Sequence, residues 1–370
     1  MNKKLVSLYS GCGGLDLGLE NAGFTTIYAN DNAKWCKDTW GINFPNTNFF
    51  QGGVKEYFEY LQTVKQKSPK SLTDIFLVAG GPPCPPFSKS RFYLKDKPRA
   101  LNDPSAEETI TYYFKIVDLI KPRCFLLENV PGIAYKAHKD ALEYLLSTSK
   151  QLGYETSWAI LNAADYGVPQ IRQRFILVGS KDKKFVFPQP THGKTETSQL
   201  DFDQRLPWVT AGDVLNDIDS EENASDVGHY AGGKHNDLLR QVPPGDNYLY
   251  FTKERGHPNP VFKWRSRYWS FLLKLDPNQP SWTIQARRSN NMGPLHWRNR
   301  ILRINEVKRL QTFPDTWYLH GNVEQQWRQV GNAVPPLLSE QIGKEILTQF
   351  NTKTKNLKHW HLEGTKRETC

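Results

Sequence analysis

A single cysteine, Cys84, stands in a stiff turn where its thiol could act as a nucleophile. Residues 80–88 read GGPPCPPFS and directly follow an apolar, strand-like stretch over residues 74–79. Glycine permits a sharp turn, and each proline fixes φ near −65° and removes a backbone donor. A thiol held in this way at the carboxyl end of a buried strand lies where open α/β sheets have their active sites. The alternative is a buried structural cysteine beside a proline-rich loop, and the motif alone does not decide between the two.

A glycine-rich turn near the start of the chain has the composition of a cofactor-binding loop. Residues 9–14 read YSGCGG and lie between a predicted strand and a predicted helix. Glycines there let the backbone approach a ligand, and the helix amino terminus favours a negative group. Asp31 ends the next predicted strand about twenty residues later, where a carboxylate can accept hydrogen bonds from ribose hydroxyls. The pair favours a nucleotide-type cofactor over the alternative, a tight structural turn.

An acid and an amide follow another predicted strand. Glu128 and Asn129 come directly after the strand predicted over residues 124–127. Because the carboxyl ends of parallel strands meet at one edge of a sheet, we expect both side chains at the same edge as Cys84. The alternative is that Glu128 caps a helix.

Two arginines alternate along a short polar segment. Residues 170–174 read QIRQR, and strand geometry would direct Gln170, Arg172 and Arg174 to one face. Inward-facing arginines are costly unless they bind anions or carbonyl groups. They are therefore candidate substrate ligands, with a half-exposed edge strand as the alternative.

The elements that must position these residues alternate between strand-like and helix-like stretches. This pattern predicts an α/β fold with a Rossmann-like, mostly parallel sheet, followed by a smaller, irregular region. Periodicity weakens beyond residue 188, and residues 217–225 have the composition of an acidic surface loop. Strands are predicted over residues 4–9, 25–30, 74–79, 124–127 and 175–179, and helices over residues 15–22, 107–120, 139–151, 305–312 and 335–350.

The segment from residue 251 to residue 310 combines positive charge with aromatic side chains. It contains thirteen lysines and arginines against three acids, a surplus equal to the net charge of +10 of the whole chain. Interleaved basic and aromatic residues suit a nucleic acid, whose phosphates are held while its bases are contacted. The alternative is a solvated basic face over an ordinary aromatic core. The aromatic residues are Phe251, Phe262, Trp264, Tyr268, Trp269, Phe271, Trp282 and Trp297.

Length and composition indicate a globular protein. The 370 residues, of which 38% are hydrophobic and 23% charged, suffice for two domains. No apolar run approaches the roughly 18 residues of a membrane-spanning helix, and no export signal is evident, so we expect a cytoplasmic protein with no membrane partner. The five cysteines lack metal-binding spacing, which predicts reduced thiols and no metal site.

Taken together and in order, these motifs resemble those of the cytosine-5 DNA methyltransferase family, the modification enzymes typical of bacteria and their phages. Two more motifs near the end of the chain, RLQTFPD over residues 309–315 and QVGNAVP over residues 329–335, belong to the same resemblance. The matching segments extend from about the fourth residue to the mid-340s. The resemblance implies a methyltransferase that acts on cytosine in duplex DNA, with S-adenosyl-L-methionine as methyl donor.

The resemblance also implies roles for the candidate catalytic residues. Cys84 corresponds to the nucleophile that adds to carbon 6 of the target cytosine, which makes carbon 5 reactive. Glu128 corresponds to the group that hydrogen-bonds ring nitrogen 3 and the exocyclic amine, and Asn129 helps to place that loop. Arg172 corresponds to the arginine that holds the cytosine carbonyl oxygen, and Arg174 to its supporting partner.

The implied cofactor pocket draws on both ends of the chain. Tyr9 corresponds to an aromatic side chain that packs on the adenine, Asp31 to the acid that binds the ribose hydroxyls, and Asn332 to a residue that completes the pocket. The return of Asn332 implies that the last helix rejoins the catalytic domain. The other residues at matching positions are Gly11, Gly13, Gly14, Leu15, Pro83 and Val334.

The segment between the two catalytic parts is expected to recognise DNA. A base inside a duplex is out of reach of Cys84, so the target must swing out of the helix. Residues 243–245 and 283–284 also resemble family features there. We expect catalytic parts over residues 1–195 and 323–350, a recognition domain over residues 196–322 and a polar tail over residues 351–370. Candidate DNA contacts are Ser88, Arg265, Arg267, Arg287, Arg288, Asn290 and Asn291, with phosphate contact the commoner role for any one of them.

Two positions depart from the family pattern. Pro85 stands where glutamine usually follows the nucleophile, which puts one polar contact near the flipped base in doubt. Gly53 stands where an acid commonly contacts the adenine amine, so cofactor affinity is weaker or another group substitutes.

Two other functions compete with this interpretation. One branch of the family methylates tRNA, but the long basic segment favours DNA. A catalytically inactive DNA-binding relative would be expected to have lost at least one of Cys84, Glu128, Arg172 and Asn332. We expect a monomer, with a cognate restriction endonuclease as a possible partner.

Overall fold

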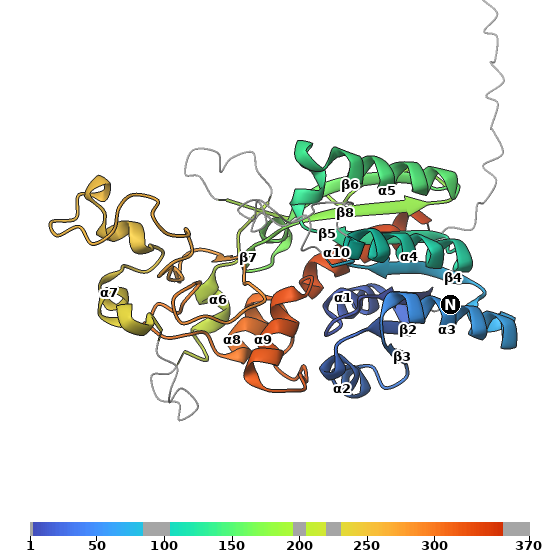
Figure 1. Ribbon diagram of the computed structural model, residues 1–370, viewed down its shortest axis with the longest axis horizontal. Helices are drawn as coiled ribbons and strands as arrows, with labels where there is room; N and C mark the ends of the chain where they lie inside the picture. Colours follow the sequence, from blue (N-terminus) through green and yellow to red (C-terminus); the bar gives the residue numbers. More distant parts are fainter. Residues whose placement is uncertain (1–2, 84–103, 195–204, 220–230, 351–370) are drawn as a thin grey trace, which may run out of the picture.

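A seven-stranded, mostly parallel sheet forms the centre of the larger lobe (Figure 1). The computed structural model describes residues 3–83, 104–194, 205–219 and 231–350. Pairing is parallel from β3 through β5, whereas β8 runs antiparallel to both β5 and β6. In sheet order the strands are β3 (Asn48–Gln51), β2 (Phe24–Asp31), β1 (Lys3–Leu8), β4 (Ile75–Gly80), β5 (Cys124–Asn129), β8 (Gln173–Ser180) and β6 (Glu155–Asn162).

Helices cover both faces of this sheet. Successive residues of β1 point to opposite faces, so Val6 belongs to one hydrophobic cluster and Leu5 to another. The Val6 cluster includes side chains of α3 (Val54–Lys67), α4 (Pro104–Ile120) and α5 (Lys139–Gln151). The Leu5 cluster includes side chains of α1 (Gly14–Ala22) and α10 (Pro336–Phe350). Every residue of β4 and β5 is buried, as expected for central strands covered on both faces.

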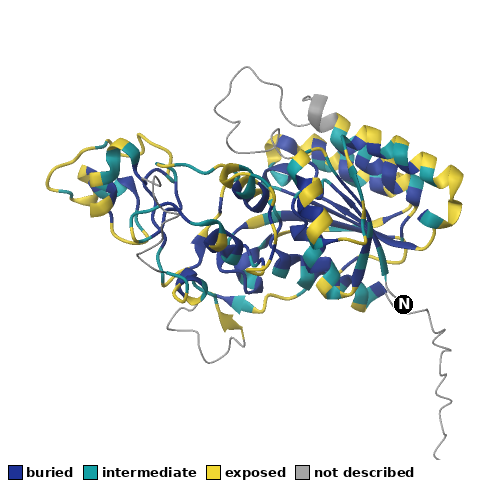
Figure 2. Ribbon diagram, turned by 90° about the horizontal axis from the view of Figure 1, so that it is seen from below, coloured by how far each residue is buried: buried dark blue, intermediate teal, exposed yellow. Residues whose placement is uncertain are grey.

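The second lobe consists of short elements joined by long connections (Figure 2). One of its strands, β11, pairs in parallel with β7 at the edge of the larger lobe. The remaining helix of the larger lobe is α2 (Lys34–Asn43). The helices further along the chain are α6 (Ala211–Leu215), α7 (Asn236–Gln241), α8 (Ile304–Leu310) and α9 (Val323–Asn332). The remaining short strands are β7 (Gln170–Ile171), β9 (His192–Gly193), β10 (Leu206–Pro207) and β11 (Ser281–Trp282). The 3-10 helices are η1 (Pro69–Leu72), η5 (Pro131–Ala134), η6 (Lys136–His138), η7 (Ala163–Tyr166), η9 (Gly233–His235), η10 (Tyr248–Phe251) and η11 (Lys253–Arg255).

The two lobes share a hydrophobic cluster. Trp40 of α2 stacks on Phe44 with ring centroids 4.1 Å apart, and Phe44 meets Trp317 edge-to-face at 5.3 Å. The same cluster continues to Trp327 of α9 and to Leu275 of the second lobe. Apolar burial therefore holds the lobes together.

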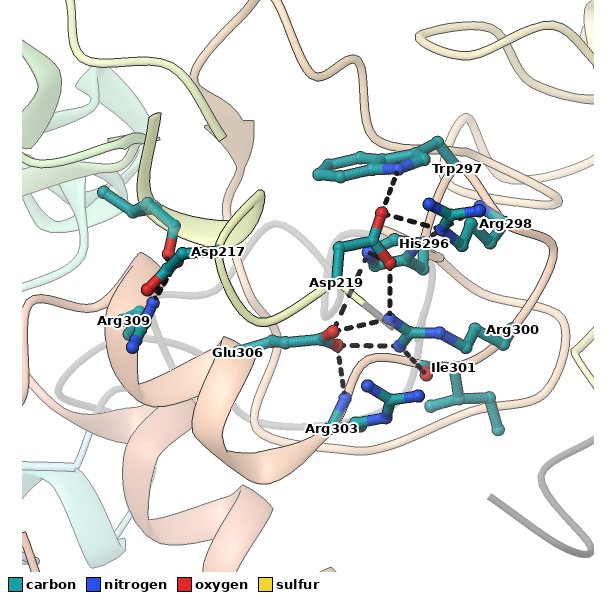
Figure 3. A network of polar contacts seen from close by, with 11 residues as sticks. Asp217, Asp219, His296, Trp297, Arg298, Arg300, Ile301, Arg303, Glu306 and Arg309 are labelled. Carbon is teal, nitrogen blue, oxygen red and sulfur yellow. Dashed lines mark hydrogen bonds and ion pairs between the residues drawn. The ribbon is translucent and has the colours of Figure 1, made fainter. Parts of the chain in front are cut away.

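A buried network of charged side chains stabilises the second lobe (Figure 3). Glu306 of α8 accepts hydrogen bonds from both terminal nitrogens of Arg300, at 2.8 and 2.6 Å, and from the backbone N–H of Arg303 at 2.7 Å. Asp219 accepts from Arg298 at 2.7 Å. The prediction of an acidic surface loop over residues 217–225 was wrong at Asp219, whose side chain is only 5% exposed, because these arginines neutralise it in the interior.

A histidine in the same network is neutral. His296 is fully buried, with its Nε2 atom 3.6 Å from Asp219 and 3.7 Å from Glu306. Burial, assisted by the positive charge of Arg300, lowers the pKa of His296 to about 3. The acids therefore rely on arginines for their counter-charges.

The predicted α/β fold is confirmed, and each predicted strand and helix is found with its ends within three residues of those predicted. The strand predicted over residues 170–174 is interrupted, although the predicted alternation holds: Gln170 and Arg172 are buried and the Arg174 side chain is 11% exposed, whereas Gln173 is exposed. The strand ends at Ile171 and resumes at Gln173, so Arg172 lies in the break between β7 and β8. The two arginines consequently have different surroundings, which are described below.

A buried acid in α1 makes the stability of the fold depend on pH. Asp16 is fully buried, and neither of its carboxyl oxygens has a hydrogen-bond partner among the described residues. Burial raises the pKa of Asp16 from 3.8 to about 7. The folded state therefore holds this proton more tightly than the unfolded state, so the stabilisation present at low pH is lost as the pH rises through 7.

Asp16→Asn is expected to remove this part of the pH dependence. Between pH 6 and pH 8 the wild type should lose about 1.4 kcal/mol of unfolding free energy that the variant does not lose. Urea titrations of both proteins at several pH values measure the difference. Parallel stability curves for the two proteins would contradict the assignment.

Candidate active site

The strand ends bring the predicted motifs to one edge of the sheet. Strands β1, β2, β4 and β5 are parallel, so the segments that follow their carboxyl ends meet there. Strand β8 is antiparallel, and Asn129 pairs with Phe175, which brings the beginning of β8 to the same edge. Arg174 therefore lies beside the end of β5.

The turn after β1 requires glycine. Gly13 has φ of 82°, and a Cβ atom on it would overlap the ring of Phe44. A Cβ atom on Gly14 would lie 2.5 Å from the carbonyl oxygen of Val334. By contrast, a Cβ atom on Gly11 would meet nothing within 4 Å, so the turn borders open space at that point.

The Asp31 carboxylate lies beside this open space. Its carboxylate accepts the backbone N–H groups of Gly11 and Ala33, both at 2.9 Å. Burial raises the pKa of Asp31, and the two N–H groups act in the opposite direction. The Tyr9 hydroxyl donates to the carbonyl oxygen of Thr109 at 2.7 Å, which fixes the aromatic ring beside the turn. A rigid turn, open space and a strand-end acid together fit a ribose-containing cofactor.

A second carboxylate, that of Glu56, lies close to the end of β2. The backbone N–H of Gly52 donates to the carbonyl oxygen of Asp31 at 3.1 Å, and the Asn30 amide donates to the carbonyl oxygen of Gly52 at 2.8 Å. The next residue, Gly53, has no side chain, and the Oε2 atom of Glu56 occupies the place where one would begin. The sequence pattern missed Glu56, because only the first turn of α3 brings it back over Gly53.

Glu128 and Asn129 lie against the beginning of the Cys84 turn. A Cβ atom on Gly81 would lie 2.6 Å from the Oε2 atom of Glu128, so this glycine leaves room for the carboxylate. The Asn129 amide donates to the carbonyl oxygen of Pro82 at 3.3 Å. Cys84 and Ser88 lie outside the described residues, as does Pro85.

Arg174 and Glu128 form a nearly buried ion pair. The Nε atom of Arg174 is 2.8 Å from Oε1 of Glu128, and the two side chains are 11% and 9% exposed. Burial raises the pKa of Glu128, although the charges of Arg174 and Arg172 act in the opposite direction. This glutamate therefore holds a proton more readily than an exposed one.

Arg172 has a different set of partners. It is 1% exposed, and its guanidinium donates to the carbonyl oxygens of Ile284 at 2.9 Å, Gly331 at 2.7 Å and Ala333 at 3.0 Å. It also donates to the side chain of Gln170 at 3.3 Å. Arg172 thus connects the end of β7 to two segments more than a hundred residues away.

The carboxyl-terminal part of the chain returns to the glycine turn. The Cys12 thiol donates to the carbonyl oxygen of Gln329 at 3.3 Å, and Val334 packs against Gly14. Asn332, the last residue of α9, is exposed beside them, and Leu15 is buried with α10 in the Leu5 cluster. Pro83 is exposed at the end of the described part of the Cys84 turn.

The candidate DNA contacts differ in exposure. Arg265, Arg267, Arg287 and Asn290 are exposed. Arg288 is 14% exposed and pairs with Glu324 at 3.4 Å. The side-chain oxygen of Asn291 is buried. The exposed residues are therefore better placed for DNA than Arg288 or Asn291.

The described part of the chain contains neither a cluster of metal ligands nor a membrane-spanning helix. In the described ranges no group of three or more histidine, cysteine or acidic side chains is placed to hold a metal ion. No helix over those same residues is long and apolar enough to span a membrane.

Comparison with known proteins adds a family to this geometry. The sequence model of the family of C-5 cytosine-specific DNA methylases matches residues 3–348. The chain is 37% identical to the type II methyltransferase M.SacI of Streptomyces achromogenes, over 95% of this chain and 94% of that protein. It is 30% identical to the type II methyltransferase M.NgoFVII of Neisseria gonorrhoeae, over 94% of this chain and 87% of that protein.

Solved structures share the fold at lower sequence identity. A putative DNA modification methyltransferase encoded within an E. coli prophage superimposes with a TM-score of 0.65 at 22% identity, covering 95% of this chain and all of that one. The Dnmt2 methyltransferase of S. pombe superimposes with a TM-score of 0.58 at 15% identity, with the same coverage.

Proposed function

The chain belongs to the C-5 cytosine-specific DNA methylase family, and we propose that it methylates carbon 5 of a cytosine within a specific duplex sequence. The observation that carries this proposal is the position of Glu128, which is paired with Arg174 and packed against the glycine that begins the Cys84 turn. The alternative of an inactive relative is disfavoured because this carboxylate and its partner retain a buried, mutually supporting geometry.

The chemistry requires a nucleophile, because cytosine is too electron-poor at carbon 5 to accept a methyl group directly. The Cys84 thiolate would add to carbon 6, and the ring electrons would become available at carbon 5. S-adenosyl-L-methionine, when bound, supplies an electrophilic methyl group on a sulfonium. The proton at carbon 5 would then leave to a base, and the C–S bond to Cys84 would break and release the thiolate.

Glu128 would hold the cytosine ring during addition. A carboxyl group whose pKa is raised by burial can share a proton with ring nitrogen 3, which draws electrons from the ring as the thiolate adds. The structure supports exchanging the roles predicted for the two arginines. Arg174, in contact with Glu128, is better placed to reach the cytosine carbonyl oxygen, whereas the two terminal nitrogens of Arg172 already donate to backbone carbonyl groups.

A matched pair of lysine variants tests this exchange. Arg172→Lys should lower the free energy of unfolding by about 1.5–3 kcal/mol, because lysine cannot reproduce the planar fork that holds three carbonyl oxygens. Arg174→Lys should mainly lower kcat. Thermal unfolding and single-turnover methylation of both variants separate the effects. A stable Arg172→Lys enzyme with reduced kcat, beside a fully active Arg174→Lys enzyme, would restore the original assignment.

The cofactor would lie in the open space beside Gly11, next to Asp31. Gly11 borders the open space, Asp31 would accept the ribose hydroxyls, and Tyr9 would pack beside the adenine. Asn332 and Val334 would close the pocket from the carboxyl-terminal side, with Gly13, Gly14, Leu15 and Pro83 around it. We further propose that Glu56 substitutes for the acidic residue that the family commonly has at position 53, because its carboxylate lies where a side chain on Gly53 would begin.

Glu56→Ala is therefore expected to weaken cofactor binding by about 10- to 100-fold, the loss of one hydrogen bond to a charged group. Titration calorimetry with S-adenosylhomocysteine measures this without turnover. Glu59→Ala, on the next turn of the same helix, serves as the control and should leave affinity unchanged. Equal affinities of the wild type, Glu56→Ala and Glu59→Ala would contradict the proposal that Glu56 binds the adenine amine.

The substrate would be duplex DNA, with the target base extruded. Exposed Arg265, Arg267, Arg287 and Asn290 lie in the proposed recognition domain, residues 196–322, and would contact it. The relatives named type II methyltransferases support a role beside a cognate restriction endonuclease. We propose that the enzyme acts as a monomer, since one active site can treat each strand in turn.

Transfer of a labelled methyl group tests the function. Wild type and Cys84→Ala would be incubated with labelled S-adenosylmethionine and either unmethylated duplex DNA or tRNA. Label in DNA that disappears with the variant is the expected result, and bisulfite sequencing then identifies the site. Label only in tRNA would favour the tRNA branch, and no label in either would favour a binding protein.

A further inference from the structure

Two tryptophans form an exposed aromatic pair between the lobes. Trp269 and Trp282 meet edge-to-face, with ring centroids 4.4 Å apart. They are nevertheless 47% and 39% exposed. Large aromatic side chains that remain in water as a cluster indicate a contact surface, because their burial against a partner would be favourable.

The backbone fixes this pair close to the candidate active site. Trp282 is in register with Ile171, the residue before Arg172, and the Thr283 hydroxyl donates to the carbonyl oxygen of Ile171 at 2.7 Å. The Asn247 amide donates to the carbonyl oxygen of Trp269 at 2.8 Å. The Trp282 backbone is therefore paired with Ile171, and Arg174 of the Arg174–Glu128 pair follows Ile171 by three residues.

The charge around the pair identifies the kind of partner. Residues 263–269 read KWRSRYW, and all of them are exposed. Three cations and no acid accompany the aromatic side chains there. A protein partner of mixed charge has no need of this pattern, whereas a polyanion with flat aromatic groups matches both of its parts.

We propose that the Trp269–Trp282 pair is a stacking surface for nucleobases that lose their pairing beside the target cytosine. This inference rests on the proposed function, since only an enzyme that opens a duplex produces such bases at this position. Stacking on an aromatic side chain does not depend on base identity, so the surface would hold the opened strand without reading its sequence.

A pair of bubble duplexes tests the proposal. One 30-base-pair probe carries four unpaired thymines, and the other carries four abasic residues at the same positions with the same phosphates. Wild type should bind the thymine bubble about 5- to 100-fold more tightly than the abasic bubble. Trp269→Ala and Trp282→Ala should reduce that ratio towards one, mainly by weakening the thymine complex, and Trp282→Phe should retain most of it.

Two controls separate stacking from other effects. Trp158→Ala removes a tryptophan that is 41% exposed on the edge strand β6, and should leave the ratio unchanged. Arg267→Ala should weaken both complexes equally and reduce the salt dependence of binding. If the double variant Trp269→Ala/Trp282→Ala kept the wild-type ratio of the two bubble affinities, the stacking inference would be overturned, but the proposed methyltransferase function would still stand. Absence of any methylation by wild type would instead contradict the proposed function.

Discussion

Replacement of Glu128 with glutamine is expected to lower the rate of methyl transfer by about 10²–10⁴-fold. The carboxyl group lies at the end of β5, packed against Gly81 and paired with Arg174. Glutamine has the same shape but cannot share a proton with ring nitrogen 3, so the electron demand on the cytosine ring is lost. The loss should appear in kcat, because the interaction strengthens as the thiolate adds.

Single-turnover methylation under saturating DNA measures this loss. Binding of S-adenosylhomocysteine should be unchanged, since Glu128 lies outside the proposed cofactor pocket. Glu143→Gln, on the exposed face of α5, provides a control with the same chemical change. A Glu128→Gln enzyme that retains a tenth or more of the wild-type rate would remove Glu128 from the chemistry.

Replacement of Glu306 with alanine is expected to lower the free energy of unfolding by about 3–5 kcal/mol. The variant removes a fully buried carboxylate and leaves Arg300, whose side chain is 12% exposed, with the carbonyl oxygen of Ile301 at 3.3 Å and, as its one acidic partner among the described residues, the more distant Asp219 at 3.4 Å. It also removes the acceptor for the backbone N–H of Arg303 at the start of α8. Such a loss is a large fraction of the stability of an ordinary domain.

An exposed ion pair supplies the comparison. Glu143 contacts Lys139 at 3.0 Å, with both side chains more than half exposed, so Glu143→Ala should change the unfolding free energy by less than about 0.5 kcal/mol. Urea unfolding followed by fluorescence measures both variants. Equal effects of the two substitutions would mean that water reaches the Glu306 network and screens its charges.

Much of the candidate site could be predicted from the sequence because its residues follow strands. Asp31 and Glu128 occur at the ends of short apolar runs, and a parallel sheet necessarily gathers such ends at one edge. Local pattern and topology are sufficient for that inference. Helix α3 is a counter-example, because it was not predicted, although Val54, Tyr57 and Leu61 of its fourteen residues are buried.

The remaining features depend on contacts between distant segments. The sequence pattern placed Arg172 and Arg174 on one strand, but Arg172 lies in the break between β7 and β8, where it donates to carbonyl groups of residues 284, 331 and 333. Asp219 looks like a surface acid until Arg298 and Arg300 are brought against it. The aromatic content of the basic segment was visible, but which two rings meet was not.

The return of α10 to the sheet has a consequence for how the protein is made. The face of the sheet that carries Leu5 is covered by α1 and by α10, which begins at Pro336, near the end of the described chain. A ribosome releases the strands first, so this apolar face stays partly uncovered until the last residues emerge. For most of that interval the nascent enzyme also lacks Asn332 and Val334, the residues proposed to close the cofactor pocket. Chains that stop before α10 would therefore be both inactive and prone to aggregate, and methylation would begin only after α10 has been made.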